Sequence, residues 1–102
     1  MRRVQIQPKA RRDLMDIHRN LNETLGNSKA DQFETSASQT FLDLARMPNI
    51  GASRKMERDR HRDVRMWRVR DFMEYLIFYS VEPDLVRIDR VIHAKRDYKR
   101  QM

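Results

Sequence analysis

The chain has 102 residues, of which 22 are Lys or Arg and 15 are Asp or Glu, giving a formal net charge of +7. This length fits a single domain, and we expect residues 1–102 to form one. The lack of cysteine excludes disulfides, thiolate catalysis and cysteine-based zinc sites. The sequence lacks the apolar core of a signal peptide and the ~18 continuous apolar residues of a membrane helix, so we expect a cytoplasmic protein without membrane contact.

The basic excess favours an anionic partner, such as nucleic acid or an acidic protein surface. Basic residues are concentrated in residues 54–70 and again in residues 87–100. The alternative is that this charge only keeps the protein soluble. The clustering favours a specific anionic partner over that alternative.

The N-terminal residues predict a strand followed by a helix. Val4 and Ile6 alternate with polar neighbours, which predicts a strand at residues 3–7. Residues 9–25 carry apolar side chains three or four positions apart, which predicts an amphipathic helix ending at Gly26. The buried stripe of this helix is expected to consist of Ala10, Leu14, Ile17, Leu21 and Leu25.

A second helix is predicted directly after the first. Ser28 is expected to be its N-cap, with Asp31 completing a variant capping box, and Pro48 ends it. Two helices joined by a short turn should form an antiparallel hairpin that buries its apolar side against a sheet. The stripe of the second helix is expected to consist of Ala30, Phe33, Ala37, Phe41 and Leu44.

The C-terminal half predicts three strands after a polar connector at residues 49–62. Residues 63–70, 72–80 and 85–93 are rich in β-branched and aromatic side chains, and their short connections predict an antiparallel meander. The middle strand is apolar on both faces and is expected to be central. The predicted fold is therefore α+β with the order β-α-α-β-β-β, a helical hairpin packed on a small, mostly antiparallel sheet.

Alternation along the last strand assigns its side chains to two faces. One face is expected to hold Val86, Ile88 and Ile92, and the other Arg87, Asp89 and His93. The predicted core also contains the large aromatic side chains of Phe33, Phe41, Trp67, Phe72 and Phe78. Methionines that are expected to join this core are Met47, Met56, Met66 and Met73.

Several segments carry patterns that recur together in one group of proteins. Residues 10–17 place an Ala before Asp-Leu and a later Ile, and residues 41–51 contain Leu, Pro and Gly at set intervals. Residues 64–67 and 75–79 follow as a pair of strands. In their order and spacing these segments resemble the ParE/RelE superfamily of bacterial toxins, and the resemblance covers most of the chain.

The C-terminal segment favours one branch of that superfamily. Residues 90–97 are Arg-Val-Ile-His-Ala-Lys-Arg-Asp. This is similar to the Arg-Val-Leu-His-Gly-x-Arg-Asp ending common in the ParE branch, with Ile92 in place of Leu and Ala94 in place of Gly. The resemblance therefore favours ParE over RelE.

The resemblance implies the toxin of a type II toxin–antitoxin system, encoded beside a small antitoxin. Such an antitoxin is typically a ribbon-helix-helix DNA-binding protein whose C-terminal segment folds onto the toxin, giving a hetero-oligomer. The ParE branch implies a protein that inhibits DNA gyrase by binding, without enzymatic activity, as in plasmid stabilisation. The RelE branch implies an endonuclease that cuts messenger RNA on the ribosome. A third possibility is an inactive module that only binds its antitoxin.

A metal-free ribonuclease needs cations that stabilise the phosphate and groups that transfer protons. If the chain is such an enzyme, the candidate catalytic residues are Arg68, His93, Arg96 and Tyr98. The alternative is that His93 and Arg96 tie the C-terminal residues to the sheet and that Tyr98 packs there. Because the ParE branch carries the same His and Arg without cutting RNA, no catalytic residue is favoured.

The densest basic run lies between the second helix and the following strand. It can contact an anionic target, or it can be a solvated loop whose charge aids solubility. Contacts with the target are expected to involve Arg54, Lys55, Arg58, Arg60, Arg62, Lys95 and Arg96.

A helical antitoxin segment would need an apolar groove, expected between the helical hairpin and the sheet. Outer residues of the first helix that are expected to contribute are Arg11, Met15 and Arg19. His18 and His61 are interpreted as surface histidines. Because no set of His, Asp and Glu has metal-ligand spacing along the chain, we expect neither a metal nor another cofactor.

Overall fold

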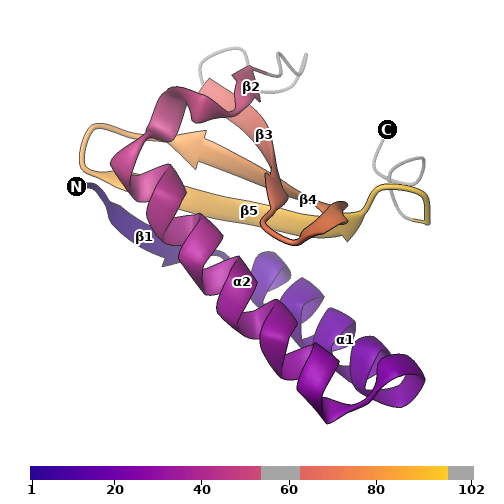
Figure 1. Cartoon of the computed structure of the whole chain (residues 1–102). Helices are drawn as coiled ribbons and strands as arrows, with labels where there is room; N and C mark the ends of the chain where they lie inside the picture. The colour runs from indigo at the N-terminus through magenta and orange to yellow at the C-terminus, as the bar shows by residue number, and fades with distance from the viewer. Residues whose placement is uncertain (54–62, 97–102) are drawn as a thin grey trace.

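A sheet with two helices on one side forms the structure, a computed structural model that describes residues 1–53 and 63–96 (Figure 1). In those residues the elements are β1 (Arg3–Ile6), α1 (Pro8–Leu25), α2 (Asn27–Arg46), the short 3-10 helix η1 (Pro48–Ile50), β2 (Ala52–Ser53), β3 (Asp63–Val69), β4 (Phe72–Val81) and β5 (Leu85–His93). The predicted α+β fold is confirmed, and the predicted order of elements fits apart from η1 and β2. No helix in the described residues has the length and hydropathy needed to span a membrane.

The strand order in the sheet is β1-β5-β4-β3-β2. Strands β3, β4 and β5 form the predicted antiparallel meander, and β4 lies at its centre. Strand β1 pairs in parallel with β5. The two helices that follow β1 give the chain enough length to cross over and return to the sheet in the same direction. The sequence did not predict η1 and β2, which lie inside the expected connector; β2 is a two-residue strand paired with Arg65 and Met66 of β3.

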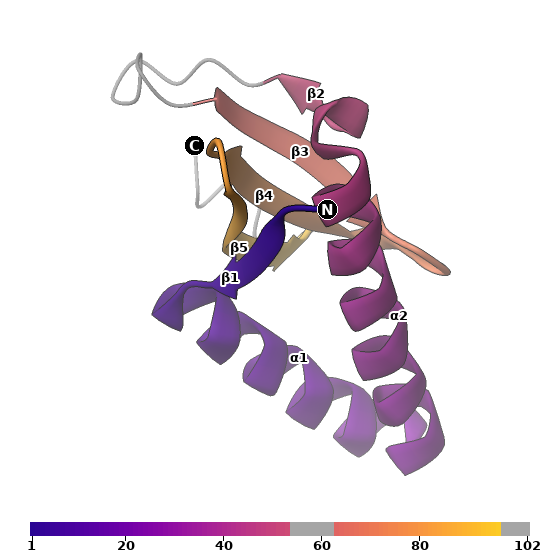
Figure 2. The ribbon, with the colours of Figure 1, turned by 90° about the vertical axis from the view of Figure 1, so that its left-hand side faces the viewer.

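The two helices form the predicted hairpin, whose turn projects away from the strands (Figure 2). Gly26 adopts a φ of 95°, and its N–H donates to the carbonyls of Leu21 and Asn22. This residue ends α1 and also serves as the N-cap of α2. The predicted cap at Ser28 is therefore wrong: α2 already begins at Asn27, without a side-chain hydrogen bond at its cap.

The core lies between the sheet and the apolar sides of both helices. Every residue of the predicted α2 stripe is buried, and Phe33 packs edge-on against the rings of Phe72 and Tyr75. On α1 the stripe is buried up to Leu21 apart from Leu14, which is partly buried. The prediction that Leu25 is buried is wrong, because it lies 63% exposed at the projecting end of the hairpin.

Part of the predicted core is on the surface instead. Trp67 is 37% exposed, and Met47 and Met73 are 59% and 58% exposed. Phe78 and Met66 are half-buried, and Met56 lies outside the described residues. The prediction is therefore wrong for Met47, Trp67 and Met73, whose side chains the described elements cover only in part.

Strand β5 contains a bulge that changes which of its side chains face the helices. Phe78 pairs with Arg90 while Tyr79 pairs with Ile88, so Asp89 is an extra residue. Beyond the bulge, Val91 joins the core beneath the helices. Ile92 then points to the opposite face, so its predicted place beside Ile88 is wrong.

A carboxylate from α1 completes the edge of β5 beyond the end of β1. Strand β1 pairs with β5 only as far as Ile88. Past that point, Asp13 accepts hydrogen bonds from the Val91 N–H at 3.0 Å and from Arg90 Nε at 2.8 Å and Nη2 at 3.1 Å. The Asp13 side chain is only 15% exposed, so these bonds are shielded from water and fix α1 to the sheet.

Replacing Asp13 with Ala should lower the free energy of unfolding by about 2–3 kcal/mol, because Arg90 and the Val91 N–H lose their acceptor. The matched control is Asp16→Ala on the same helix, whose exposed ion pair with Arg19 contributes less than ~0.5 kcal/mol. Urea unfolding curves measure both losses. Equal losses in the two variants would contradict this account.

Candidate functional site

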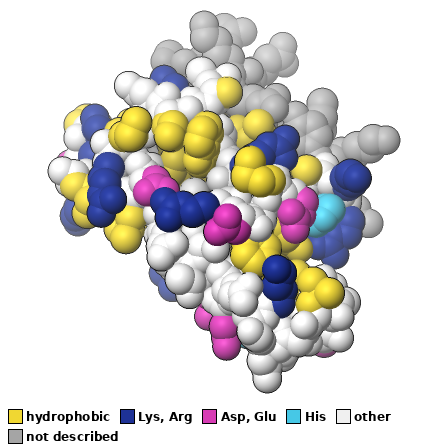
Figure 3. All heavy atoms as spheres, in the orientation of Figure 1, with side chains coloured by type: hydrophobic (Ala, Val, Ile, Leu, Met, Phe, Trp, Pro, Cys, Tyr) yellow, Lys and Arg dark blue, Asp and Glu magenta, His cyan; other side chains and the backbone are white. Residues whose placement is uncertain are grey.

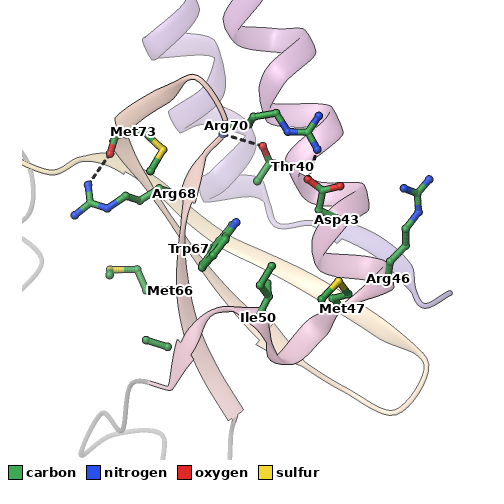
Figure 4. Close-up of a pocket in the computed structure, with 11 residues that line it drawn as sticks. Thr40, Asp43, Arg46, Met47, Ile50, Met66, Trp67, Arg68, Arg70 and Met73 are labelled. Carbon is green, nitrogen blue, oxygen red and sulfur yellow. Dashed lines mark hydrogen bonds and ion pairs between the residues drawn. The ribbon is translucent and has the colours of Figure 1, made fainter.

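An apolar groove of about 690 Å³ lies between the C-terminal end of α2 and strand β3 (Figure 4). Its apolar lining consists of Met47, Ile50, Ala52, Met66, Trp67 and Met73. Its polar lining consists of Thr40, Asp43, Arg46, Arg68 and Arg70. The groove thus has an apolar floor with cationic side chains at its rim.

The groove exists because two elements end early. Strand β2 pairs only with Arg65 and Met66, so β3 from Trp67 onward has no strand partner on that side within residues 1–53 and 63–96. Helix α2 ends at Arg46, so the exposed Met47 side chain stands at one end of the opening. Figure 3 shows hydrophobic side chains gathered over this part of the molecule, a grouping typical of interaction surfaces.

Polar contacts hold the rim of the groove in place. The backbone N–H of Arg70 donates to Thr40 Oγ1 at 3.1 Å, and its Nη2 forms an ion pair with Asp43 at 2.5 Å. Arg68 Nη1 donates to the carbonyl of Met73 at 2.5 Å. The turn after β3, where Asp71 has a φ of 65°, is therefore anchored on α2.

A buried hydroxyl supports the wall formed by η1 and β2. Tyr79 OH donates to the Pro48 carbonyl at 2.8 Å and accepts from the Gly51 N–H at 2.9 Å. A Cβ at Gly51 would lie 2.6 Å from the Met66 carbonyl oxygen and closer still to the Tyr79 hydroxyl, so only glycine fits here. Burial raises the pKa of Tyr79, and the Gly51 hydrogen bond and Arg65 partly offset that rise.

The predicted antitoxin contacts on α1 lie outside the groove. Arg11, Met15 and Arg19 are exposed on the first helix and do not line it. The groove does lie between the hairpin and the sheet, but α2 supplies its helical wall. Met47, Trp67 and Met73 were predicted to be core residues, so their sequence pattern did not reveal them as groove residues.

The candidate catalytic residues are not all on one face. Arg68 lies opposite Leu76 on β4, and His93 lies opposite Tyr75 on the same strand. Because Tyr75 and Leu76 are adjacent in β4 and point to opposite faces, Arg68 and His93 also lie on opposite faces of the sheet. His93 Nδ1 accepts from the backbone N–H groups of Lys95 at 3.1 Å and of Arg96 at 3.2 Å. The ring of His93 also packs edge-on against Tyr75, so the contacts of His93 tie the turn after β5 to the sheet.

The remaining candidates are only partly described. Lys95 and Arg96 are exposed in the turn after β5, and Arg96 Nη2 lies 3.5 Å from the Tyr75 hydroxyl. Tyr98 lies outside the described residues. So do five of the expected anion contacts: Arg54, Lys55, Arg58, Arg60 and Arg62.

One group of side chains brings potential metal-ligating atoms close together, although the sequence predicted no metal site. Among residues 1–53 and 63–96, the only trio of His, Asp and Glu with ligand atoms close enough to share an ion is His18, Asp31 and Glu34. These residues lie on the helical hairpin, away from the groove.

The helical hairpin packed on a mostly antiparallel sheet is the fold expected of the ParE/RelE superfamily. The family described as the ParE toxin of the type II toxin–antitoxin system parDE matches residues 4–98, and the chain belongs to this family. The expected ParE branch is therefore confirmed. A solved structure described as a chromosomal ParDE system from P. aeruginosa has the same fold, with a TM-score of 0.74 and 21% identity over 93% of this chain and 98% of that chain. A search of curated proteins found no match.

Replacing Tyr79 with Phe should lower the free energy of unfolding by about 1–3 kcal/mol, because the Pro48 carbonyl and the Gly51 N–H stay buried without their partner. The folded pKa of Tyr79 lies above its unfolded value of 10.0, so its stabilising effect is complete below pH 10 and is lost as the pH rises further. Unfolding curves at about pH 8 and about pH 11 should therefore show a steeper loss in the wild type than in Tyr79→Phe. Parallel losses would argue against this role.

Proposed function

We propose that the chain is a toxin that inhibits DNA gyrase by binding to it, without enzymatic activity. We further propose that a small ribbon-helix-helix antitoxin neutralises the toxin in the cytoplasm by filling the apolar groove. The observation that carries the proposal is this groove, whose lining includes Met47, Trp67 and Met73. Membership of the ParE family of type II systems supports it.

The groove has the chemistry of a site that receives a polypeptide. Trp67 offers a large aromatic surface of the kind that dominates binding energies, and flexible methionines adapt to varied apolar side chains. Arg70 on the rim is already paired with Asp43, but Arg46 and Arg68 add positive charge that favours an antitoxin segment with carboxylates beside its apolar residues. The open edge of β3 also suits an extended segment that adds a strand.

The contacts of His93 support a mechanism by binding rather than by RNA cleavage. Its Nδ1 already accepts two backbone hydrogen bonds, so that nitrogen is occupied by a structural role. Arg68 lies on the face of the sheet opposite to His93, which argues against the two side chains acting on one phosphate. The exposed Lys95 and Arg96 remain suited to anion contacts with the target.

In a supercoiling assay, an excess of the folded chain should stop gyrase from supercoiling relaxed plasmid. Reversing two charges in Lys95→Glu/Arg96→Glu should weaken inhibition roughly tenfold, because the anionic contact becomes repulsive. The matched control reverses the exposed charges of Lys9 and Arg12 on α1 and should inhibit like the wild type.

Two results would contradict the gyrase proposal. Normal supercoiling at excess toxin, with the fold verified by circular dichroism, would exclude gyrase as the target. Cleavage of messenger RNA on stalled ribosomes that disappears in Arg96→Ala would favour the RelE-type alternative. If neither activity is found and antitoxin binding persists, the chain is an inactive binding module.

If the antitoxin fills the groove, substituting two exposed methionines should affect antitoxin binding differently. Met73→Ser should weaken binding of the small protein encoded beside the toxin about tenfold or more, because a buried methionine side chain contributes about 1.5–3 kcal/mol. Met15→Ser, on α1 outside the groove, should leave it unchanged. Calorimetric titration measures both affinities. The opposite ranking would move the contact surface to α1, beside Arg11 and Arg19.

A further inference from the structure

Three side chains with metal-binding atoms converge across the helical hairpin. His18 lies on α1, while Asp31 and Glu34 lie one turn apart on α2. His18 Nε2 is 3.2 Å from Asp31 Oδ1 and 3.9 Å from Glu34 Oε1. All the ligand atoms of the trio lie within 4.8 Å of one another.

We propose that His18, Asp31 and Glu34 bind a divalent transition-metal ion, with zinc as the best match. One imidazole nitrogen and two carboxylate oxygens are ligands that zinc accepts at about 2.0–2.2 Å. Ligand atoms around a tetrahedral ion at such distances are about 3.4 Å apart. The spacing in the hairpin is close to this, so small side-chain rotations suffice to close the site.

The backbone beneath the trio is already fixed. Ile17 and Leu21 on α1 and Phe33 on α2 are buried in the core, so the two helices are held in register without an ion. Asp31 and Glu34 are like charges one helical turn apart, and their repulsion favours a bound cation. The side chains of Asp31 and Glu34 are 72% and 63% exposed, so water can complete the coordination of the ion.

An ion bound here would contradict the expectation of no metal, which rested on spacing along the chain. The three ligands come from two helices, and only the turn at Gly26 brings them together. A bound ion would join α1 to α2 between the turn at Gly26 and the middle of the hairpin. The site lies apart from the apolar groove, so it is independent of the proposed function.

Zinc titrated into the metal-free full chain should bind at one ion per chain at this site and raise the melting temperature by roughly 5 °C or more at saturation. His18→Gln and Glu34→Gln should each weaken zinc binding at least tenfold. The matched control, Glu23→Gln, changes an exposed acid on α1 outside the trio and should bind zinc like the wild type. Calorimetry measures the affinity and the stoichiometry.

A titration with magnesium distinguishes specific zinc binding at the trio from general attraction of cations to the two carboxylates. Magnesium prefers oxygen ligands and does not need His18. It should leave the melting temperature unchanged at the zinc concentrations used. An equal effect of magnesium, or zinc binding that survives in folded His18→Gln, would overturn the proposal. No zinc binding by the wild type would mean that the trio forms an ion pair only.

Discussion

A single buried hydroxyl fixes one wall of the exposed groove. Tyr79 OH bridges the Pro48 carbonyl and the Gly51 N–H, and it thereby fixes both ends of η1 against the central strand. Arg65 adds bonds to the carbonyls of Asn49 and Gly51 on the same side. Because these contacts hold the chain between α2 and β2, the wall of the groove is set before any partner arrives, and the partner need not order it.

Local patterns predicted the elements well, because each depends on periodicity that neighbouring residues carry. The α2 stripe from Ala30 to Leu44 was predicted in full, since one continuous face of a helix lies on the sheet. The bulge at Asp89 could not be predicted, because it arises from the pairing of β5 with β4 and not from β5 alone. The prediction of a separate N-cap at Ser28 was wrong because Gly26 ends α1 and also begins α2, and the pattern of either helix alone does not show this.

The candidate site was less predictable, because exposure depends on which elements cover a residue. Met47, Trp67 and Met73 look like core residues in the sequence, but they are exposed in the fold, where α2 ends at Arg46 and β2 pairs with only two residues of β3. The His18 trio was hidden in the same way, since its ligands lie 13 and 16 residues apart on different helices. Family resemblance indicated the type of protein, whereas only the three-dimensional arrangement revealed these surfaces.

The parallel pairing of β1 with β5 has a consequence for the order in which the protein forms. Arg3 is paired with Leu85, and within the described residues β1 has no other strand partner. During synthesis the first strand therefore waits for the last one, and such long-range pairing is slow to form. A ribosome must synthesise the chain beyond Ile88 before β1 can join the sheet, so the folded toxin forms only after β5 has been made.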